Sequence, residues 1–452
     1  MIEKEINELI QWDADHILHA VFPVGQTSGL VVESGEGIYI RDIRGKEYMD
    51  GSSQLTCVNL GHSQQEIIDA AYKQMRKLQY STTFLGVSNP PMIECGKKLA
   101  ELTPEGLDYF HFTSGGSEST DVAYRLARLY WSKKGSQKYK IISLYDSYHG
   151  ISLGSCTADG LGRGFFGRGA GPPTPGFIHV PNYHCYHCMM GLSYPSCGVA
   201  CARFLEETII REGADTVAAF IAEPEHGTAG SIAPPPEYWP MVSKICAKND
   251  VLLIVDEVMT GFGRTGKMFA VEHWNVIPDI MTMAKGITSA YFQLGAVAVN
   301  QKVHEGLKGS MFGGYTYSGH PVALAAAVKT MEIYVRDKIV ENAAKVGKYA
   351  KDRLEAELKP LPCVGDIGGL GLMLGIEIVS NKETRKPFPL EMNVLPKVLK
   401  QALEAGLFMR GTSSAIAPGD RLSFTPPLII TTEQVDSMID ILHPILSNLK
   451  PL

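Results

Sequence analysis

Residues 251–286 contain two short apolar runs, each ending at a residue suited to chemistry. The first reads Val-Leu-Leu-Ile-Val-Asp-Glu-Val at 251–258, and after a glycine-rich turn the second reads Met-Thr-Met-Ala-Lys-Gly at 281–286. Continuous apolar runs are typical of strands that are buried on both faces of a parallel sheet. Because ligands in open α/β sheets bind at the carboxyl ends of the strands, we expect Asp256 and Lys285 at one site on that edge.

The chemistry of this pair suits one cofactor in particular. A lysine amine can form a Schiff base with an aldehyde. A carboxylate can keep the ring nitrogen of pyridoxal phosphate protonated, so that the ring accepts electrons. Taken alone, a helix cap at Asp256 and a solvated Lys285 are the commoner explanation. The pair therefore needs support from the rest of the chain.

A possible phosphate site lies earlier in the sequence. A glycine-rich turn follows the predicted strand at 110–113 and precedes a helical run that extends to Trp131. Backbone N–H groups at the start of a helix bind phosphate, and glycine lets the phosphate approach closely. Gly115, Gly116 and Ser117 are therefore candidate ligands, and an ordinary helix cap near Ser117 is an equally good explanation.

A second loop, at 145–150, follows the predicted strand at 141–144 and carries Tyr148 and His149. An aromatic residue after a strand can stack on the planar ring of a cofactor. Packing against neighbouring loop residues is the simpler explanation when this loop is considered alone.

The composition limits the class of protein. A chain of 452 residues is too long for one compact core, so we expect at least two domains. A net charge of −6 gives no basic footprint for nucleic acid. No apolar run reaches membrane-spanning length, and the N-terminus does not resemble a signal peptide. We therefore expect a cytoplasmic protein without nucleic-acid or membrane partners.

The order of predicted elements indicates an α/β protein with two domains. Alternating residues at 29–50 predict an antiparallel meander, and we assign 1–60 to the N-terminal lobe of a small domain. Residues 61–317 should form a large domain with a mostly parallel central sheet, and 318–452 the rest of the small α+β domain. The segment 160–176, rich in Gly, Pro and Arg, predicts a long loop.

Four of the nine cysteines are closely spaced, namely Cys185, Cys188, Cys197 and Cys201. This spacing could hold a structural zinc ion. The four residues could instead stay reduced as small apolar side chains or form one local disulfide. Because a chain of this length can fold without a metal, we predict no metal in the active site and leave the state of these thiols open.

Together, the motifs resemble those of class III aminotransferases of pyridoxal-phosphate fold type I, over nearly the whole chain. The matching segments are Gly-Gly-Ser-Glu at 115–118, Tyr-His-Gly at 148–150, Glu-Pro at 223–224, Asp-Glu-Val at 256–258, Gly-Phe-Gly-Arg-Thr-Gly at 261–266, Ala-Lys-Gly at 284–286 and Thr-Tyr-Ser-Gly-His-Pro at 316–321. Each segment is common alone, but all of them in this order are specific.

The resemblance implies roles around the cofactor ring. It makes Lys285 the Schiff-base lysine and the carrier of the transferred proton. It makes Asp256 the partner of the pyridine nitrogen, and it places Val258 on one ring face and Tyr148 on the other. Glu223 is expected beside Asp256.

The resemblance also implies roles around the phosphate. The backbone of Gly116 and Ser117 would hold the phosphate, and Gly115 and His149 are counted among the cofactor-binding residues. Thr316 matches the residue that reaches the phosphate of the neighbouring subunit. This implies a homodimer with shared active sites, and a tetramer is the alternative assembly.

Within the class, the chain resembles most the ω-amine:pyruvate group, through Leu-Thr-Cys-Val-Asn-Leu-Gly-His at 55–62 and the segments 408–411 and 421–428. Arg410 matches the mobile arginine that binds the carboxylate of the substrate, with Glu223 on its side of the pocket. A guanidinium fork suits a carboxylate, and the long stem lets it swing away for uncharged amines. A surface ion pair is the alternative for Arg410.

One residue departs from the pattern of that group. Thr56 stands where the group usually has a tryptophan that walls the substrate pocket, so we expect a wider or more polar pocket. The usual preference for arylalkylamines is therefore in doubt. Phe22 and Phe84 match other aromatic residues of the pocket.

We therefore expect a ping-pong transfer of an amino group from an amine, diamine, taurine or ω-amino acid to a keto acid, with pyruvate as the expected acceptor. A 2-oxoglutarate-dependent aminotransferase, a decarboxylating transaminase and an aminomutase are alternatives that share the cofactor. A cofactor-binding protein without turnover is a further alternative, against which the intact Lys285, Asp256 and Glu223 argue.

Overall fold

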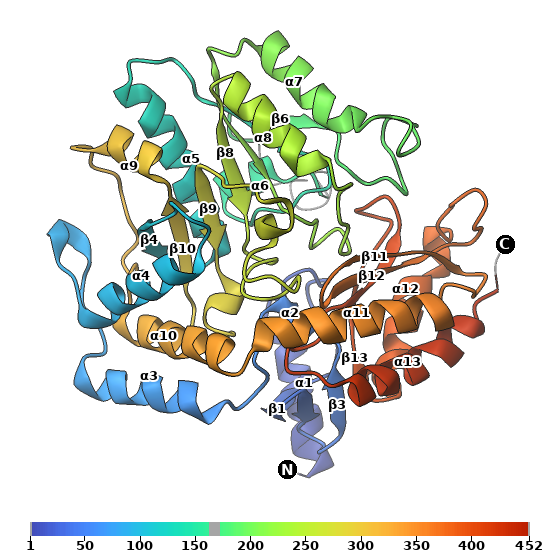
Figure 1. Ribbon diagram of the computed structural model, residues 1–452. Helices are drawn as coiled ribbons and strands as arrows, with labels where there is room; N and C mark the ends of the chain where they lie inside the picture. Colours follow the sequence, from blue (N-terminus) through green and yellow to red (C-terminus); the bar gives the residue numbers. More distant parts are fainter. Residues whose placement is uncertain (1, 162–171, 451–452) are drawn as a thin grey trace.

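The computed structural model describes residues 2–161 and 172–450, so most of the loop predicted at 160–176 lies outside the described residues. The large central sheet has the strand order β4-β10-β9-β8-β7-β5-β6. Figure 1 labels β4, β10, β9, β8 and β6 of this sheet. In that order the strands are Tyr109–Thr113, Gly295–Val299, Ile280–Met283, Leu252–Asp256, Val217–Ala222, Lys140–Leu144 and Phe177–Val180.

The direction of the strands confirms the predicted sheet type. Pairs β5–β6, β5–β7, β7–β8 and β8–β9 are parallel, whereas β10 runs antiparallel to both β4 and β9. The sheet is therefore mostly parallel, as expected from the apolar runs that precede Asp256 and Lys285. Asp256 is the last residue of β8, and Lys285 lies two residues after the end of the parallel strand β9, so both lie at the same edge of the sheet.

Helices cover both faces of the sheet because alternate strand residues point to opposite sides. Leu252 and Ile254 of β8 belong to the buried cluster formed with α5 (Gly116–Lys133). Leu253 and Val255 belong to the other cluster, which includes α7 (Ala200–Glu212) and α8 (Tyr238–Lys248). Other helices between residues 61 and 336 are α3 (Gln65–Lys77), α4 (Pro90–Leu102), α6 (Leu153–Ala158), α9 (Gln301–Leu307) and α10 (Pro321–Arg336).

Two smaller sheets combine segments from both ends of the chain. The predicted meander is present as β1 (Val32–Glu36), β2 (Tyr39–Asp42) and β3 (Glu47–Asp50), and β3 pairs in parallel with β13 (Leu407–Phe408). The third sheet has the order β11-β12-β15-β14. Its strands are Val364–Leu370, Met373–Ile378, Asp420–Phe424 and Arg410–Thr412.

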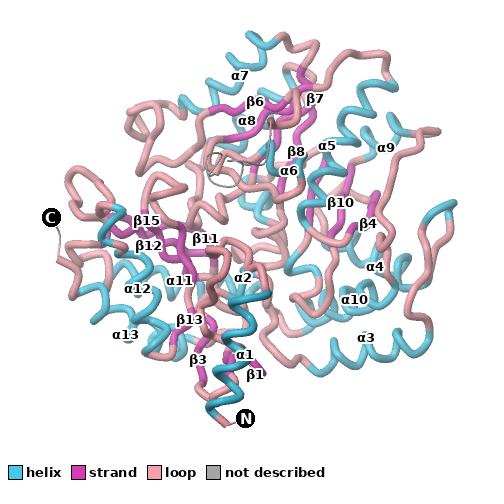
Figure 2. Tube along the Cα trace, turned by 180° about the vertical axis from the view of Figure 1, so that it is seen from behind, coloured by secondary structure: helices cyan, strands magenta, loops and turns pink. Residues whose placement is uncertain are grey.

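The C-terminal helices α11 (Ile339–Glu357), α12 (Val394–Glu404) and α13 (Thr432–Ser447) lie beside the third sheet, and α1 (Glu3–His16) and the short α2 (Ser53–Thr56) lie near the meander (Figures 1 and 2). The helix α10 packs against α3 and α4. The exact boundaries between the two domains stay a prediction.

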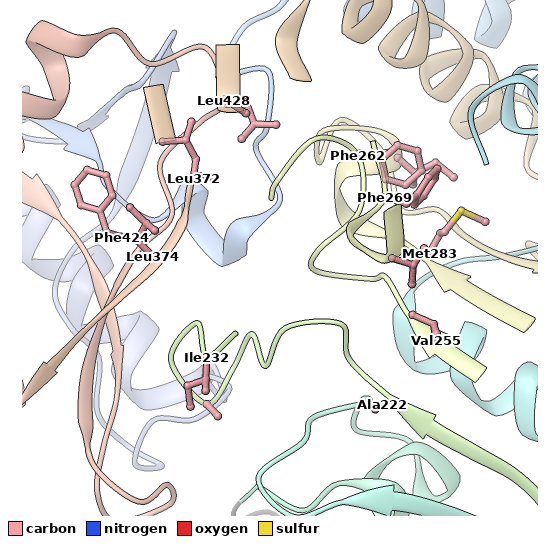
Figure 3. Close-up of a cluster of buried hydrophobic side chains, with 14 of the residues drawn as sticks. Ala222, Ile232, Val255, Phe262, Phe269, Met283, Leu372, Leu374, Phe424 and Leu428 are labelled. Atoms are coloured by element: carbon pink, nitrogen blue, oxygen red, sulfur yellow. The ribbon is translucent and has the colours of Figure 1, made fainter. Parts of the chain in front are cut away.

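One buried cluster joins the central sheet to the third sheet (Figure 3). It includes Ala222 and Val255 at the ends of β7 and β8, and Leu374 and Phe424 of β12 and β15. The strands of the third sheet are therefore held in a fixed place relative to the edge where Asp256 lies. Within the described part of the chain, no helix combines the length and apolar character needed to cross a membrane.

Candidate active site

A cavity of about 170 Å³ lies at the carboxyl edge of the central sheet. Loops that follow β4, β5, β7, β8 and β9 supply its walls. The lining residues are Gly116, Ser117, Tyr148, His149, Gly150, Glu223, Thr228, Asp256, Val258, Met259 and Lys285. The structure thus brings together most of the candidate residues that the sequence indicated.

The Asp256 carboxylate is buried and held from three sides. Its Oδ1 accepts hydrogen bonds from the Val258 N–H and the Thr282 hydroxyl, each at 3.0 Å, and its Oδ2 lies 2.7 Å from Nδ1 of His149. Burial by itself would lower the pKa of His149, but the hydrogen bond and the charge of Asp256 outweigh it and raise that pKa. Such bonding fixes the orientation of the carboxylate.

Lys285 begins a short 3-10 turn directly after β9, with a left-handed φ of +48°. A non-glycine residue with a left-handed backbone conformation is strained, and the surrounding structure must hold it in that conformation. Burial lowers the pKa of the Lys285 amine, and the nearby positive charge of Arg410 lowers it further. A lowered pKa makes the neutral amine, which is the nucleophilic form, easier to reach.

Two glycines open space at the start of α5. A Cβ on Gly116 would lie 2.8 Å from Cγ1 of Val258, and a Cβ on Gly150 would lie 2.5 Å from Oγ of Ser117. Gly150 also has a φ of +140°, which a side chain rarely adopts. The free N–H groups of the first helical turn suit a phosphate. Phosphate donors, a buried carboxylate and a lysine in one cavity are the three contacts that pyridoxal phosphate requires, so the residues fit this cofactor.

Glu223 has a fixed set of partners on the wall of the cavity. Its Oε1 accepts from the Tyr148 N–H at 3.0 Å and lies 3.2 Å from Nδ1 of His226, and its Oε2 accepts from the Gly227 N–H at 2.9 Å. Both carboxylate oxygens are therefore engaged by these three residues.

Arg410 lies on β14, close enough to Lys285 and Tyr148 for its charge to affect the pKa of both. Burial lowers the pKa of Arg410 itself. Within the described part of the chain, no carboxylate forms an ion pair with its guanidinium. Because a half-buried cation without a carboxylate partner is costly, this position suits a group that receives an anion from a substrate.

Besides Arg410 and Gly115, four of the predicted residues are not among those that line the cavity in the single chain. Thr56 is buried, with its hydroxyl 3.1 Å from that of Thr425, so it does not stand among the lining residues. Phe22 and Phe84 are 41% and 47% exposed. Thr316 is exposed, and its carbonyl accepts from the Tyr80 hydroxyl at 2.8 Å.

Two further residues at the site, Thr282 and Cys57, carry no motif that marks them in the sequence. The Thr282 hydroxyl donates a hydrogen bond to Asp256. Because a buried hydroxyl needs a hydrogen-bond partner, a threonine inside the apolar run at 280–283 could have indicated such a contact from the sequence. Cys57 lies near both Lys285 and Arg410 and influences their pKa values. Gly115 precedes α5, where its carbonyl accepts from the Ser119 N–H at 3.0 Å.

The four clustered cysteines line one small cavity away from the active site, and all of their thiols are free. Burial raises the pKa of Cys185 and Cys201 to about 11. Among residues 2–161 and 172–450, no group of three or more His, Cys, Asp or Glu side chains is arranged to hold a metal ion.

Comparison with known proteins gives one consistent result. The model of the family "Aminotransferase class-III" matches residues 21–446. The chain is 38% identical to a putrescine–pyruvate aminotransferase of Pseudomonas aeruginosa, over 90% of this chain and 88% of that protein. It is 36% identical to a diaminobutyrate–2-oxoglutarate transaminase of Halomonas elongata, over 96% and 94%. A solved (S)-enantioselective ω-transaminase of Thermomicrobium roseum is 40% identical, with a TM-score of 0.93 over 98% of both chains.

Proposed function

Because this chain belongs to the class III aminotransferase family, whose cofactor is pyridoxal phosphate, we propose that it transfers the amino group of an ω-amine donor to pyruvate. The names of two relatives support a donor with a terminal amine, since putrescine and diaminobutyrate each carry two amino groups. The acceptors named for these relatives differ, and the higher identity is to the pyruvate enzyme.

The observation that carries this proposal is the guanidinium of Arg410, which forms no ion pair with a carboxylate among residues 2–161 and 172–450 and whose charge acts on the Lys285 amine. A keto acid brings a carboxylate that can pair with Arg410 while its carbonyl carbon lies near the reacting amine. An amine donor without a carboxylate needs no such partner. An arginine on the β14 edge, followed by Gly411, can serve the first substrate and move aside for the second.

Each of the main residues of the cavity has a separate role in the proposed reaction. When bound, pyridoxal phosphate supplies an aldehyde that takes up the amino group and a ring that accepts electrons. Lys285 would take the proton from the substrate carbon in the first half-reaction and would give a proton to the substrate carbon in the second. Asp256 would hold the proton on the ring nitrogen, the first turn of α5 would bind the phosphate, and Val258 and Tyr148 would contact the ring.

Replacing Arg410 with alanine should selectively weaken the reaction with pyruvate. Truncating one partner of a buried charge pair costs about 2–5 kcal/mol, so the single-turnover rate constant with pyruvate should fall by roughly 30- to 5,000-fold. The half-reaction with an uncharged monoamine should change much less. Single-turnover absorbance measurements of both half-reactions, with the exposed Arg76→Ala as a control, test this. Equal losses in both half-reactions would mean that Arg410 supports the fold and does not bind the carboxylate.

A substrate panel tests the proposed donor and acceptor. A diamine, taurine, an ω-amino acid and a monoamine should each be tried with pyruvate and with 2-oxoglutarate. We expect turnover with pyruvate and terminal amines, without release of CO2. Turnover with 2-oxoglutarate alone would change the acceptor, CO2 release would indicate a decarboxylating transaminase, and movement of the amino group within one molecule would indicate an aminomutase.

We further propose that the enzyme is a cytoplasmic homodimer in which Thr316 contacts the phosphate bound by the other chain. The exposure of Thr316, Phe22 and Phe84 on the single chain supports this assembly, because a second chain would cover them. Sedimentation of the purified protein distinguishes a dimer from a monomer or a tetramer.

A further inference from the structure

We propose that His187, Glu377 and Arg421 form a positioning chain that fixes β14 and thereby places Arg410 for the carboxylate of the keto acid. This inference rests on the role proposed above for Arg410. The three residues come from distant segments, namely the cysteine-rich loop after β6, strand β12 and strand β15. None of them lines the active-site cavity.

Arg421 is the centre of this chain and is almost completely buried. One of its terminal nitrogens, Nη1, lies 2.8 Å from Oε2 of Glu377, whose side chain is also buried. Its Nε donates to the carbonyl of Gly230 at 2.8 Å. Arg421 therefore ties the third sheet to the loop that follows Glu223, which carries Thr228 into the active-site wall.

Two glycines pack closely against the side chains of Arg421 and Glu377. A Cβ on Gly230 would lie 2.7 Å from the Cβ of Arg421, and Gly230 has a φ of +109°. A Cβ on Gly419 would collide with Oε1 of Glu377. Side chains at these positions would displace Arg421 or Glu377, so the backbone leaves one arrangement for the pair.

The positioning chain of His187, Glu377 and Arg421 is connected to Arg410 by the strand pairing of the third sheet. In the register of the sheet, Arg421 of β15 lies opposite Glu377 of β12 on one side and opposite Thr412 of β14 on the other. Thr412 also donates its hydroxyl hydrogen bond to the carbonyl of Thr228. Because β14 spans only Arg410–Thr412, its position depends on these few contacts and on the Ser52 hydroxyl, which accepts from the Arg410 N–H at 2.9 Å.

His187 completes the chain from the opposite side. Its Nε2 lies 2.9 Å from Oε1 of Glu377, as an imidazole N–H donating to a carboxylate. The same loop is anchored by Arg385, which donates to the carbonyl of Tyr186 at 2.8 Å. The loop that carries the cysteine cluster therefore braces the carboxylate that holds Arg421.

The test uses His187→Leu, because this change leaves the buried Arg421–Glu377 pair intact. We expect the KM for pyruvate to rise by roughly 2- to 30-fold, the range for residues that act through an intermediate element, with little change in the monoamine half-reaction. His187→Gln, whose amide can still donate to Glu377, should restore most of the affinity for pyruvate. His443→Leu on α13 is the matched control and should have no effect.

A double variant separates this inference from the role of Arg410 itself. In an Arg410→Ala background, His187→Leu should cause no further loss with pyruvate, since the group that it positions is absent. An additive loss, an equal loss in both half-reactions, or an unchanged KM for pyruvate in the single variant would overturn the positioning chain. If Arg410→Ala alone left the pyruvate reaction unchanged, the proposed role of Arg410 would be wrong. This result differs from those that contradict the positioning chain, so the two proposals are tested separately.

Discussion

Replacing Lys285 with alanine should abolish transamination while leaving the protein folded. Lys285 lines the same cavity as Asp256 and the first turn of α5, and burial lowers the pKa of its amine, so that the neutral form that can accept a proton is easier to reach. General acid–base catalysis alone contributes up to about 10⁴-fold, so we expect the rate to fall by at least that order. Alanine keeps the Cβ and therefore the same backbone strain at φ +48°, so this term in the stability should not change.

The measurement is turnover of a diamine with pyruvate, together with the visible absorbance of the bound cofactor before and after adding the amine. The exposed Lys308→Ala serves as the control for loss of a lysine elsewhere. Thermal unfolding of both variants shows whether they fold. Substantial turnover by Lys285→Ala, without an added small amine, would mean that another residue moves the proton.

Replacing Asp256 with asparagine should leave the cofactor bound but remove most of the activity. An amide can still accept from the Val258 N–H and the Thr282 hydroxyl, so the loop geometry should survive. It carries no negative charge for the ring nitrogen, and it also deprives His149 of its anionic partner. We expect a loss of roughly 10²–10³-fold, the scale for removing one preorganised electrostatic group.

Cofactor content and the rate of the amine half-reaction should be measured in parallel for Asp256→Asn. The surface variant Asp69→Asn provides a control for the same chemical change. A rate near that of the unmodified enzyme, with full cofactor content, would show that Asp256 only caps its loop and that the cofactor lies differently in the cavity.

The sequence by itself determined the sheet type and the family, and it predicted the edge of the sheet at which Asp256 and Lys285 lie. Local patterns carry this information, because an apolar run specifies a buried strand and the residue after the run must lie at the edge of the sheet. Asp256, Lys285 and the glycine-rich turn before α5 could therefore be assigned to one edge without coordinates. The resemblance added chemistry to each position, including Arg410.

Only the tertiary structure decided which distant segments meet. The antiparallel direction of β10, the burial of Thr56 against Thr425, and the absence of an ion pair at Arg410 within the described chain depend on pairings between segments far apart in sequence. The bonds that join His187, Glu377 and Arg421 are of the same kind. A local pattern fixes where a strand or turn lies along the chain, but hydrogen bonds and ion pairs form only where packing brings two side chains to within about 3 Å of each other.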